Sequence, residues 1–452
     1  MKQSMRLISN LIMTRILAPE VFGLMAIVNL ALQALNMLSD VGISQSVIRS
    51  EREDAVYLRT AWSLQVVRGG VLWIMTVVLA WPVSQYYDEP TLLLILPCSG
   101  TMALFMGLNS IAILQYRKHL KYKKLVILDS IAAILGLVVM VALGLIYGSI
   151  WALVIGGVLS TLAMTFFGYH FFENIKHSFC WNKEVVHELY HFGKWVFLST
   201  VLTFFVGQYD KLALGKLADM HSLGLYSIAM VWAGLPVMVV SQLSNKIFYP
   251  VVNELYRGKE LVKITEIRNS LVTLSVVVCI FMMAIGHLLI NVLYEAEYKQ
   301  SGGLVSVLAV LALFQIIENI NTNLLLTVGR PKDKIISQIT GILILVVLIS
   351  PAYSQFGMTG IAFLASISMM FRAYILNFQL LKDKINTLAF DFKMTISLLT
   401  LGTISYLSIR NVSEYFSDVV LLVIASIFMS FLLIFVFLKQ QTLRSLMNVR
   451  TN

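Results

Sequence analysis

Long apolar segments alternate with short polar connections along almost the whole chain, and they constrain the fold more than any other feature of the sequence. Lipid offers backbone N–H and C=O groups no hydrogen-bond partners, so a segment that crosses a bilayer has to be a helix. A span takes about 20 residues, and on this measure the sequence predicts an all-α polytopic membrane protein with about fourteen transmembrane helices. The predicted spans are residues 2–17, 21–47, 61–84, 91–114, 124–147, 149–172, 192–214, 222–248, 269–293, 303–328, 335–354, 358–380, 389–409 and 417–438.

The composition excludes a water-soluble fold. Hydrophobic residues make up 58% of the chain and charged residues 13%, whereas soluble domains carry roughly 25% charged residues. Cys98, Cys180 and Cys279 are widely spaced, and we expect them to serve packing, with no disulfide framework and no metal cluster. No cleavage site follows the first apolar stretch, so no signal peptide is expected. That first span is short: either the helix is thin or the natural start lies upstream.

The distribution of Lys and Arg predicts the orientation, because cytoplasmic loops of membrane proteins are enriched in cations. Most of the 34 Lys and Arg residues fall in linkers of one side, and the opposite loops include the acidic stretches YYDE at 86–89 and YEAEY at 294–298. We expect both termini to be cytoplasmic in a multi-pass membrane protein. The net charge of +10 then reflects topology, and no nucleic acid partner is expected. The predicted cytoplasmic linkers are 1–6, 49–59, 115–124, 173–194, 246–268, 329–334, 380–393 and 439–452.

A short motif occurs twice. RILAPEVFGL at 15–24 and KLADMHSLGL at 216–225 each place a cation, Arg15 or Lys216, at the same distance before a Gly-Leu pair. Two similar halves are typical of transporters. We therefore predict an N-lobe over 1–190, a C-lobe over 191–380, and a C-terminal helix pair over 381–452. Both motifs are expected at the outer mouth, where turn geometry and the cavity entrance are more plausible roles than central substrate binding.

Two spans carry a polar stripe on one helical face, at spacings of three and four residues. A charge near the bilayer centre costs about 2.5–3.5 kcal/mol on insertion scales, so a stripe should face a hydrated cavity or bond to another helix. The cavity interpretation makes Asn29, Gln33, Asn36, Gln315 and Asn319 candidates for substrate binding. It makes Glu318 and Asp40, together with Asp210, candidates for ion coupling. The stripes are Asn29, Gln33, Asn36 and Asp40 in the second span, and Gln315, Glu318, Asn319 and Thr322 in the tenth.

Four cations are candidates for binding phosphate. Arg68 and Arg372 lie several residues inside the predicted cytoplasmic boundary, where a guanidinium suits bidentate binding of phosphate oxygens. The alternative for both is a side chain that extends to the interface. Arg15 and Lys211 complete the set, although Asp210 and Lys211 could instead form a local ion pair.

A zinc protease signature is present and is rejected. HELYH at 187–191 satisfies H-E-x-x-H, but it falls in a basic linker with no third ligand at a typical spacing. No nucleophile with its base and no phosphate-binding glycine loop is evident. We expect no enzymatic activity and no bound cofactor.

The order of the motifs resembles the oligosaccharide flippase branch of the MATE/MOP exporter superfamily. The resemblance covers the whole chain and is carried by RILAPE at 15–20, SDVGISQ at 39–45, FGKW at 192–195, DK at 210–211 and LGLY at 223–226. It implies a Wzx-type flippase that moves undecaprenyl-diphosphate-linked oligosaccharide repeat units, for O-antigen, capsule or exopolysaccharide, from the inner to the outer leaflet of the bacterial inner (cytoplasmic) membrane. Implied partners are the lipid-linked oligosaccharide, membrane lipids, and a polysaccharide polymerase with its chain-length machinery. Coupling to an H⁺ or Na⁺ gradient stays open.

Three other classes compete with this one. A MATE-like drug or metabolite exporter usually has twelve spans, whereas two more are predicted here. A membrane polymerase or ligase would carry a large outer loop with catalytic groups, and the outer loops here are short. A purely structural membrane protein would not need the polar stripes.

Overall fold

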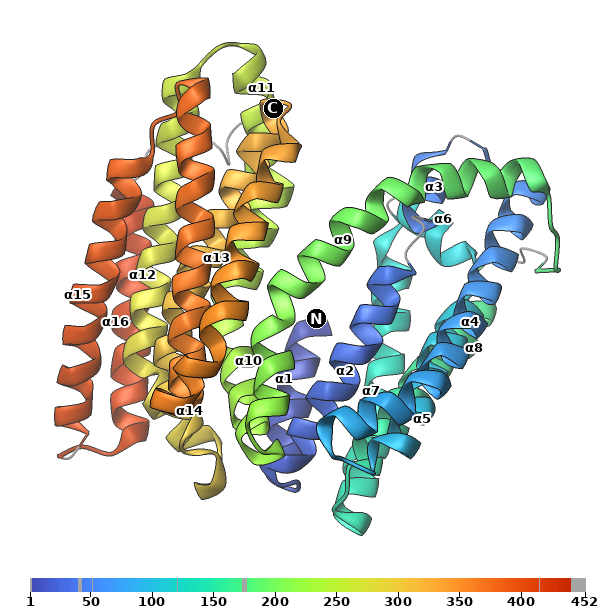
Figure 1. Cartoon of the computed structure of the whole chain (residues 1–452), viewed down its shortest axis with the longest axis horizontal. Helices are drawn as coiled ribbons and strands as arrows, with labels where there is room; N and C mark the ends of the chain where they lie inside the picture. The colour runs from blue at the N-terminus through green and yellow to red at the C-terminus, as the bar shows by residue number, and fades with distance from the viewer. Residues whose placement is uncertain are drawn as a thin grey trace. The chain divides into compact units, whose positions relative to one another are not determined.

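The computed structural model describes residues 2–39, 43–50, 52–119, 121–172, 177–413 and 415–439, with side chains left undescribed at 2–4, 6, 38, 45, 49, 187–202 and 430–439. These residues form helices throughout (Figure 1). The helices of the first half are α1 (Lys2–Met13), α2 (Pro19–Leu38), α3 (Ile43–Arg49), α4 (Ala55–Tyr87), α5 (Leu92–Gly107), α6 (Ala112–Lys118), α7 (Tyr122–Tyr147), α8 (Trp151–Phe171) and α9 (Lys183–Leu217). Those of the second half are α10 (Met220–Leu243), the π-helical η1 (Ser244–Phe248), α11 (Tyr249–Arg257), α12 (Leu261–Leu293), α13 (Ser301–Thr327), α14 (Lys334–Leu380), α15 (Leu388–Val412) and α16 (Asp418–Lys439), with short 3₁₀ turns η2 (Ala296–Tyr298), η3 (Pro331–Asp333) and η4 (Leu381–Asp383).

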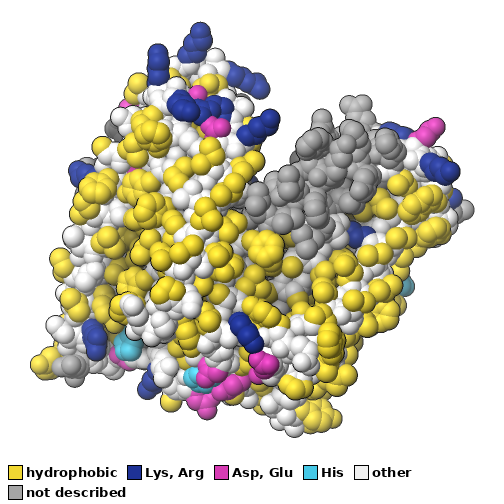
Figure 2. Space-filling model, in the orientation of Figure 1, with side chains coloured by type: hydrophobic (Ala, Val, Ile, Leu, Met, Phe, Trp, Pro, Cys, Tyr) yellow, Lys and Arg dark blue, Asp and Glu magenta, His cyan; other side chains and the backbone are white. Residues whose placement is uncertain are grey.

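The predicted all-α, polytopic fold is confirmed. Each predicted span falls largely on helical residues, and α14 contains two of the spans, joined at Gly357, which adopts φ 58°. Among the described residues, nine helices are long and apolar enough to cross a membrane, or ten if the bent pair α5 and α6 is one span. Lipid-facing helices need apolar side chains on their outer surfaces, and exposed Leu, Ile, Val and Phe cover these helices (Figure 2).

Three boundaries differ from those the sequence predicts. The predicted span over 21–47 is interrupted, because α2 ends at Leu38 and the short helix α3 begins at Ile43. The span over 91–114 bends by 64° between α5 and α6. The third difference concerns α12, which begins at Leu261 and so includes residues that the charge pattern assigned to a linker. Because the side chains at this end of α12 are polar, hydropathy alone did not predict that these residues are helical.

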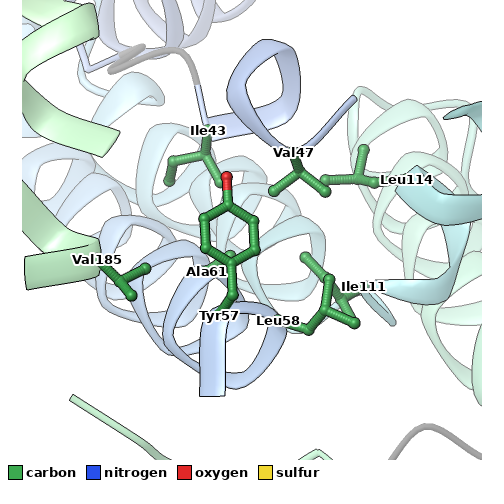
Figure 3. Packing of buried hydrophobic residues seen from close by; sticks show 8 residues of the cluster. All are labelled: Ile43, Val47, Tyr57, Leu58, Ala61, Ile111, Leu114 and Val185. Carbon is green, nitrogen blue, oxygen red and sulfur yellow. The ribbon is translucent and has the colours of Figure 1, made fainter. Parts of the chain in front are cut away.

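The chain divides into two compact units, Met1–Gly224 and Leu225–Asn452. In the N-terminal unit α7 packs along α8, α4 along α5, and α2 against α9. At one end of this unit the short helices α3 and α6 close over α4. Tyr57 is fully buried there, and its ring lies at the centre of an apolar cluster drawn from α3, α4, α6 and α9 (Figure 3). This cluster consists of Ile43, Val47, Tyr57, Leu58, Ala61, Ile111, Leu114 and Val185.

The C-terminal unit is organised around α13. This helix packs against α12 on one side and α14 on another, and α15 and α16 pack against α12 (Figure 1). Of the candidate spans, α13 is the most enclosed, with 72% of its apolar window buried. Lys and Arg side chains of this unit gather at the end that carries α11 (Figure 2). A buried central helix is where a polar residue most needs a partner.

The repeated motif places two glycines in direct backbone contact within the N-terminal unit. A Cβ added at Gly23 would lie 2.0 Å from the carbonyl oxygen of Met220, and one added at Gly224 would lie 1.9 Å from that of Pro19. The contact is reciprocal, since each glycine meets the residue four positions before the other. Small residues let helix backbones approach this closely. The repeat therefore encodes a contact between the first turns of α2 and α10.

Neighbouring polar contacts fasten the same end of the unit. Lys216 bonds Asp88 at 2.8 Å and lies 5.4 Å from the centre of the Tyr86 ring. Asp219 begins α10 by accepting the backbone N–H of Ser222, and hydrogen bonds from Ser222 lower the pKa of Asp219. Lys216 thus links the last turn of α9 to the end of α4, and the turn role of this motif stays a prediction.

Gly23→Ala tests the backbone contact. The added methyl group would overlap the Met220 carbonyl, so we expect the free energy of unfolding to fall by about 1–3 kcal/mol, typical of overpacking. Gly70→Ala is the matched control, because a Cβ at Gly70, also inside a helix, meets nothing within 4 Å. Thermal unfolding of the detergent-purified protein measures both. Equal midpoints for the two variants would contradict the close contact.

Candidate functional site in the C-terminal unit

Polar residues on α13 define the candidate site. Glu318, Asn321 and Asn323 are all buried on this largely apolar helix. Glu318 lies nine residues before the end of α13 at Thr327, about 13 Å along the helix axis at 1.5 Å per residue. An unpaired charge at that depth would be costly, so its partners decide what it can do.

Glu318 is paired with Arg372 of α14. The Nη2 of Arg372 donates to Oε1 of Glu318 at 2.5 Å, and both side chains are buried. The Nζ of Lys334, at the start of α14, lies 3.9 Å from the same carboxylate oxygen and is partly exposed. The structure thus brings together the acid predicted for ion coupling and an arginine predicted for phosphate binding, within one unit.

The stem of Arg372 is held in place by a glycine. A Cβ added at Gly341 would lie 2.4 Å from Cδ of Arg372, so the absence of a side chain makes room for this arginine. The hydroxyl of Ser368 donates to the carbonyl of Gly341 at 2.9 Å and ties the two halves of α14 together at the same level. Arg372 is therefore positioned by α14 itself before it reaches Glu318.

The remaining residues of the α13 stripe are not all satisfied. Asn319 Oδ1 and Thr322 Oγ1 are buried with no hydrogen-bond partner among the described residues, although most buried polar atoms have one. Asn323 instead donates to Ser244 and Asn245, both at 2.9 Å, at the π-helical turn η1. Gln315 is half-buried on the same face. Asn319 and Thr322 of the stripe thus have unused hydrogen-bonding capacity, whereas the neighbouring Asn323 is bonded.

A second buried charge pair was not expected from the sequence. Arg268 of α12 is fully buried and forms a bidentate ion pair with both carboxylate oxygens of Asp391 on α15. Asn377 donates to Asp391 at 2.6 Å and accepts from Asn321 at 2.9 Å, while Thr387 donates to Asn377 at 2.7 Å. This network joins α12, α13, α14 and α15. The charge pattern had assigned Arg268 to the linker 246–268 and Asp391 to the linker 380–393, where it overlaps the predicted span 389–409; the structure places both residues on helices with buried side chains.

The stripe on α2 belongs to the N-terminal unit. Asn29 and Gln33 are exposed on one face of the helix, and Asn36 is half-buried. Arg68 of α4 donates to the Ser39 hydroxyl at 3.0 Å and to the Asn36 carbonyl at 2.9 Å. Arg68 therefore bonds to the last turn of α2, whose carbonyl groups lack partners within the helix. Its predicted role in binding phosphate stays a prediction.

The other predicted residues lie apart from the Glu318 pair in the chain. Arg15 is exposed in the turn between α1 and α2, Asp210 is buried on α9, and Lys211 donates to Gln208 at 3.2 Å. Asp40 lies outside the described residues, as do the side chains of the HELYH motif at 187–191. The structure brings together Glu318 and Arg372, with Gln315, Asn319 and Thr322 on the same helix as Glu318.

Comparison with known proteins identifies the family. A family model described as polysaccharide biosynthesis protein matches residues 12–302, which is more than half of the chain. The chain belongs to this polysaccharide biosynthesis protein family. It is 20% identical over 249 residues to the succinoglycan biosynthesis transport protein ExoT of Rhizobium meliloti (strain 1021), covering 55% of this chain and 50% of that protein. The curated relatives that the chain matches are covered over 50–61% of their length.

Solved structures share the fold. The lipid II flippase MurJ, in an inward closed conformation, superposes with a TM-score of 0.69 over 99% of this chain and 98% of its own, at 14% identity. An inward-facing multidrug resistance MATE family transporter of the MOP superfamily gives a TM-score of 0.64 at 13% identity, over 86% and 95% of the two chains. At these identities the likeness concerns the fold alone. The chain is a multi-span membrane protein with the fold of MOP superfamily transporters.

The Arg268–Asp391 pair can be tested by a substitution cycle. Arg268→Met leaves the Asp391 carboxylate buried without its cation, so we expect a loss of about 3–5 kcal/mol in the free energy of unfolding. Arg268→Met combined with Asp391→Leu removes both charges and should recover most of that loss. Thermal stability in detergent reports both. A single variant as stable as the wild type would contradict the structural role of this pair.

Proposed function

We propose that this chain is a flippase for undecaprenyl-diphosphate-linked oligosaccharide repeat units, which it moves from the cytoplasmic to the outer leaflet of the bacterial inner membrane for surface polysaccharide biosynthesis. The observation that carries the proposal is the family match over 12–302 in a chain with the MOP transporter fold. The lobes alternate access, as is general for transporters built from repeats. Transport is the whole activity, and no chemical step on the sugar is involved.

The chemistry of the cargo suits the polar residues described above. A diphosphate needs cations, and Arg372 with Lys334 supplies two of them beside Glu318. A glycan needs a hydrated, polar passage, for which the exposed Asn29 and Gln33 on α2 and the half-buried Asn319 on α13 are the candidates. Arg68, Arg15 and Lys211 are further candidates for contacts with the headgroup. Ion coupling is assigned to Glu318, with Asp40 and Asp210 as the alternatives.

The lipid tail suits an apolar groove of the C-terminal unit. A hollow of about 390 Å³ lies between α12, α15 and α16 and is lined almost wholly by apolar side chains, among them Phe281, Ile404 and Phe428. A polyprenyl chain can stay in such a groove because the surrounding lipid is equally apolar. The groove lies on the helix pair that the MATE exporters usually lack.

A MATE-like, cation-coupled exporter of small molecules is the second candidate. The likeness to the MATE transporter fold over 86% of the chain favours it. The polysaccharide biosynthesis family match and the C-terminal helix pair favour the flippase. The two differ in cargo, so the lipid-linked intermediate that a cell accumulates without the protein distinguishes them.

Deletion of the gene in its host tests the proposed cargo. We expect one lipid-linked repeat unit to accumulate in the inner leaflet, and export to return with the wild-type gene.

Arg372→Ala should reduce export strongly and Arg372→Lys less so, because lysine keeps the charge but loses the planar donors. Surface polymer and extracted lipid-linked sugars are the measurements. Normal polymer in the deletion strain would contradict the function, and full export by both variants would remove Arg372 from the site.

The proposed orientation can be tested separately. Reporter fusions at Tyr87, the last residue of α4, and at Lys121, between α6 and α7, should report opposite sides of the membrane, with Lys121 in the cytoplasm. Tyr87 ends its helix and Lys121 lies in a connection, so a fused reporter at either position leaves the preceding span whole. A result that puts the two reporters on the same side contradicts the predicted topology.

A further inference from the structure

The two buried arginine–carboxylate pairs of the C-terminal unit differ in how completely they are bonded. Arg268 uses both terminal nitrogens, and its partner Asp391 also accepts from Asn377. Arg372 bonds Glu318 through Nη2 alone among the described residues, and its Nε is buried without a partner. In the first pair Arg268 Nε is also buried without a partner, but both terminal nitrogens of Arg268 are bonded within a fixed network. The second retains donors that nothing in the described structure occupies.

A guanidinium with spare donors next to a carboxylate can exchange that carboxylate for a better anion. A diphosphate carries more charge than Glu318 and presents several oxygens to the planar donors of an arginine. It also attracts the ammonium of Lys334, which lies 3.9 Å from Glu318 and is partly exposed. An anion bound to Arg372 would therefore compete with Glu318 for both cations at once.

We propose that Glu318 is the resting counter-ion of Arg372, that the diphosphate of the cargo displaces it, and that Glu318 takes up a proton from water as it is displaced. This inference rests on the function proposed above and adds a coupling step to the same site. A buried carboxylate deprived of its cation and placed beside a new negative charge is costly while it stays ionised, so it neutralises. The pair then links binding of the headgroup to uptake of one proton.

The charged surroundings of Glu318 are consistent with this exchange. From α14, Arg372 and Lys334 face it. From α12 and α15, the Arg268–Asp391 pair reaches α13 at Asn321, where its charges already compensate each other. Tyr374, also on α14, packs on Phe314 one turn from Glu318. When an anion takes both α14 cations, no uncompensated cation among these groups is left for Glu318.

Glu318→Gln separates the exchange from mere positioning. Glutamine has the same shape and can still accept a hydrogen bond from Arg372, but it carries no charge and binds no proton. Glu318→Asp keeps the titrating group on a shorter stem. Glu266→Gln is the matched control, because Glu266 is an exposed acid on α12 whose loss removes the same charge from the protein.

The measurement is calorimetric binding of farnesyl diphosphate to the full chain in detergent, in two buffers of different ionisation enthalpy. We expect the wild type to take up about one proton per molecule bound, because the displaced carboxylate neutralises. Glu318→Gln should bind farnesyl diphosphate roughly tenfold more tightly, because the competing carboxylate is gone. It should take up almost no protons on binding. Glu318→Asp should keep the proton uptake, Glu266→Gln should match the wild type, and Arg372→Gln should lose binding.

The outcomes separate the exchange from the proposed function. Equal affinity and equal proton uptake in wild type and Glu318→Gln would overturn the exchange and leave the flippase standing, provided that the wild type binds farnesyl diphosphate. A wild type that binds neither this lipid nor longer polyprenyl diphosphates would overturn the proposed function itself. Tighter binding of inorganic pyrophosphate than of farnesyl diphosphate would contradict recognition of a lipid headgroup.

Gly341→Ala is the second variant, should Glu318→Gln fail to fold, because its added methyl group would push on the side chain of Arg372. Gly303→Ala is its control, because a Cβ at Gly303 meets nothing within 4 Å. Gly341→Ala should bind farnesyl diphosphate more weakly than the wild type does. Unchanged binding would count against Arg372 as the anion ligand.

Discussion

Hydrocarbon provides no hydrogen bonds, and the organisation of this chain follows from that constraint. It makes every span a helix, and it leaves each buried charge dependent on a partner from another part of the chain. In the C-terminal unit two arginines, Arg268 and Arg372, meet two carboxylates, Asp391 and Glu318, at the levels where α12, α13, α14 and α15 pack together. The charges that are most costly to bury are thus the ones that fix how these helices meet.

The two pairs divide structural and functional work between them. The Arg268 network has its terminal nitrogens and its carboxylate bonded, and it attaches α15 to the rest of the unit. That helix in turn forms one wall of the apolar groove proposed for a polyprenyl tail. The Arg372 pair has a single strong contact and lies near polar atoms without partners, so it is the one suited to exchange anions. Both pairs are arginine–carboxylate ion pairs. The more fully bonded one serves stability, and the less fully bonded one is proposed to serve transport.

Much of the fold could be predicted from hydropathy, since a run of apolar residues has one solution in lipid. Glu318 and Arg372 could be singled out because each is a charge inside a predicted span, but their pairing could not, because they lie on different helices and nothing in the sequence fixes how those helices rotate. Arg268 and Asp391 were missed for a different reason. Both lie near helix ends in polar surroundings, which is also the pattern of a cytoplasmic linker. The end of α2 at Leu38 was missed because the polar Asp40 that follows it was assigned to a stripe within one continuous span.

The central claim is that this chain moves a diphosphate-linked oligosaccharide on a polyprenyl carrier across a bilayer. The most direct measurement reconstitutes the purified protein in liposomes that carry a fluorescent undecaprenyl-diphosphate-linked saccharide, and follows the fraction of label that an external reductant quenches. Protein-free liposomes should leave about half of the label protected in the inner leaflet, because a large polar headgroup does not cross hydrocarbon unaided. Liposomes with the protein should lose that protection, while a labelled phospholipid stays protected. Protection of the saccharide lipid equal to that of protein-free liposomes would contradict the account.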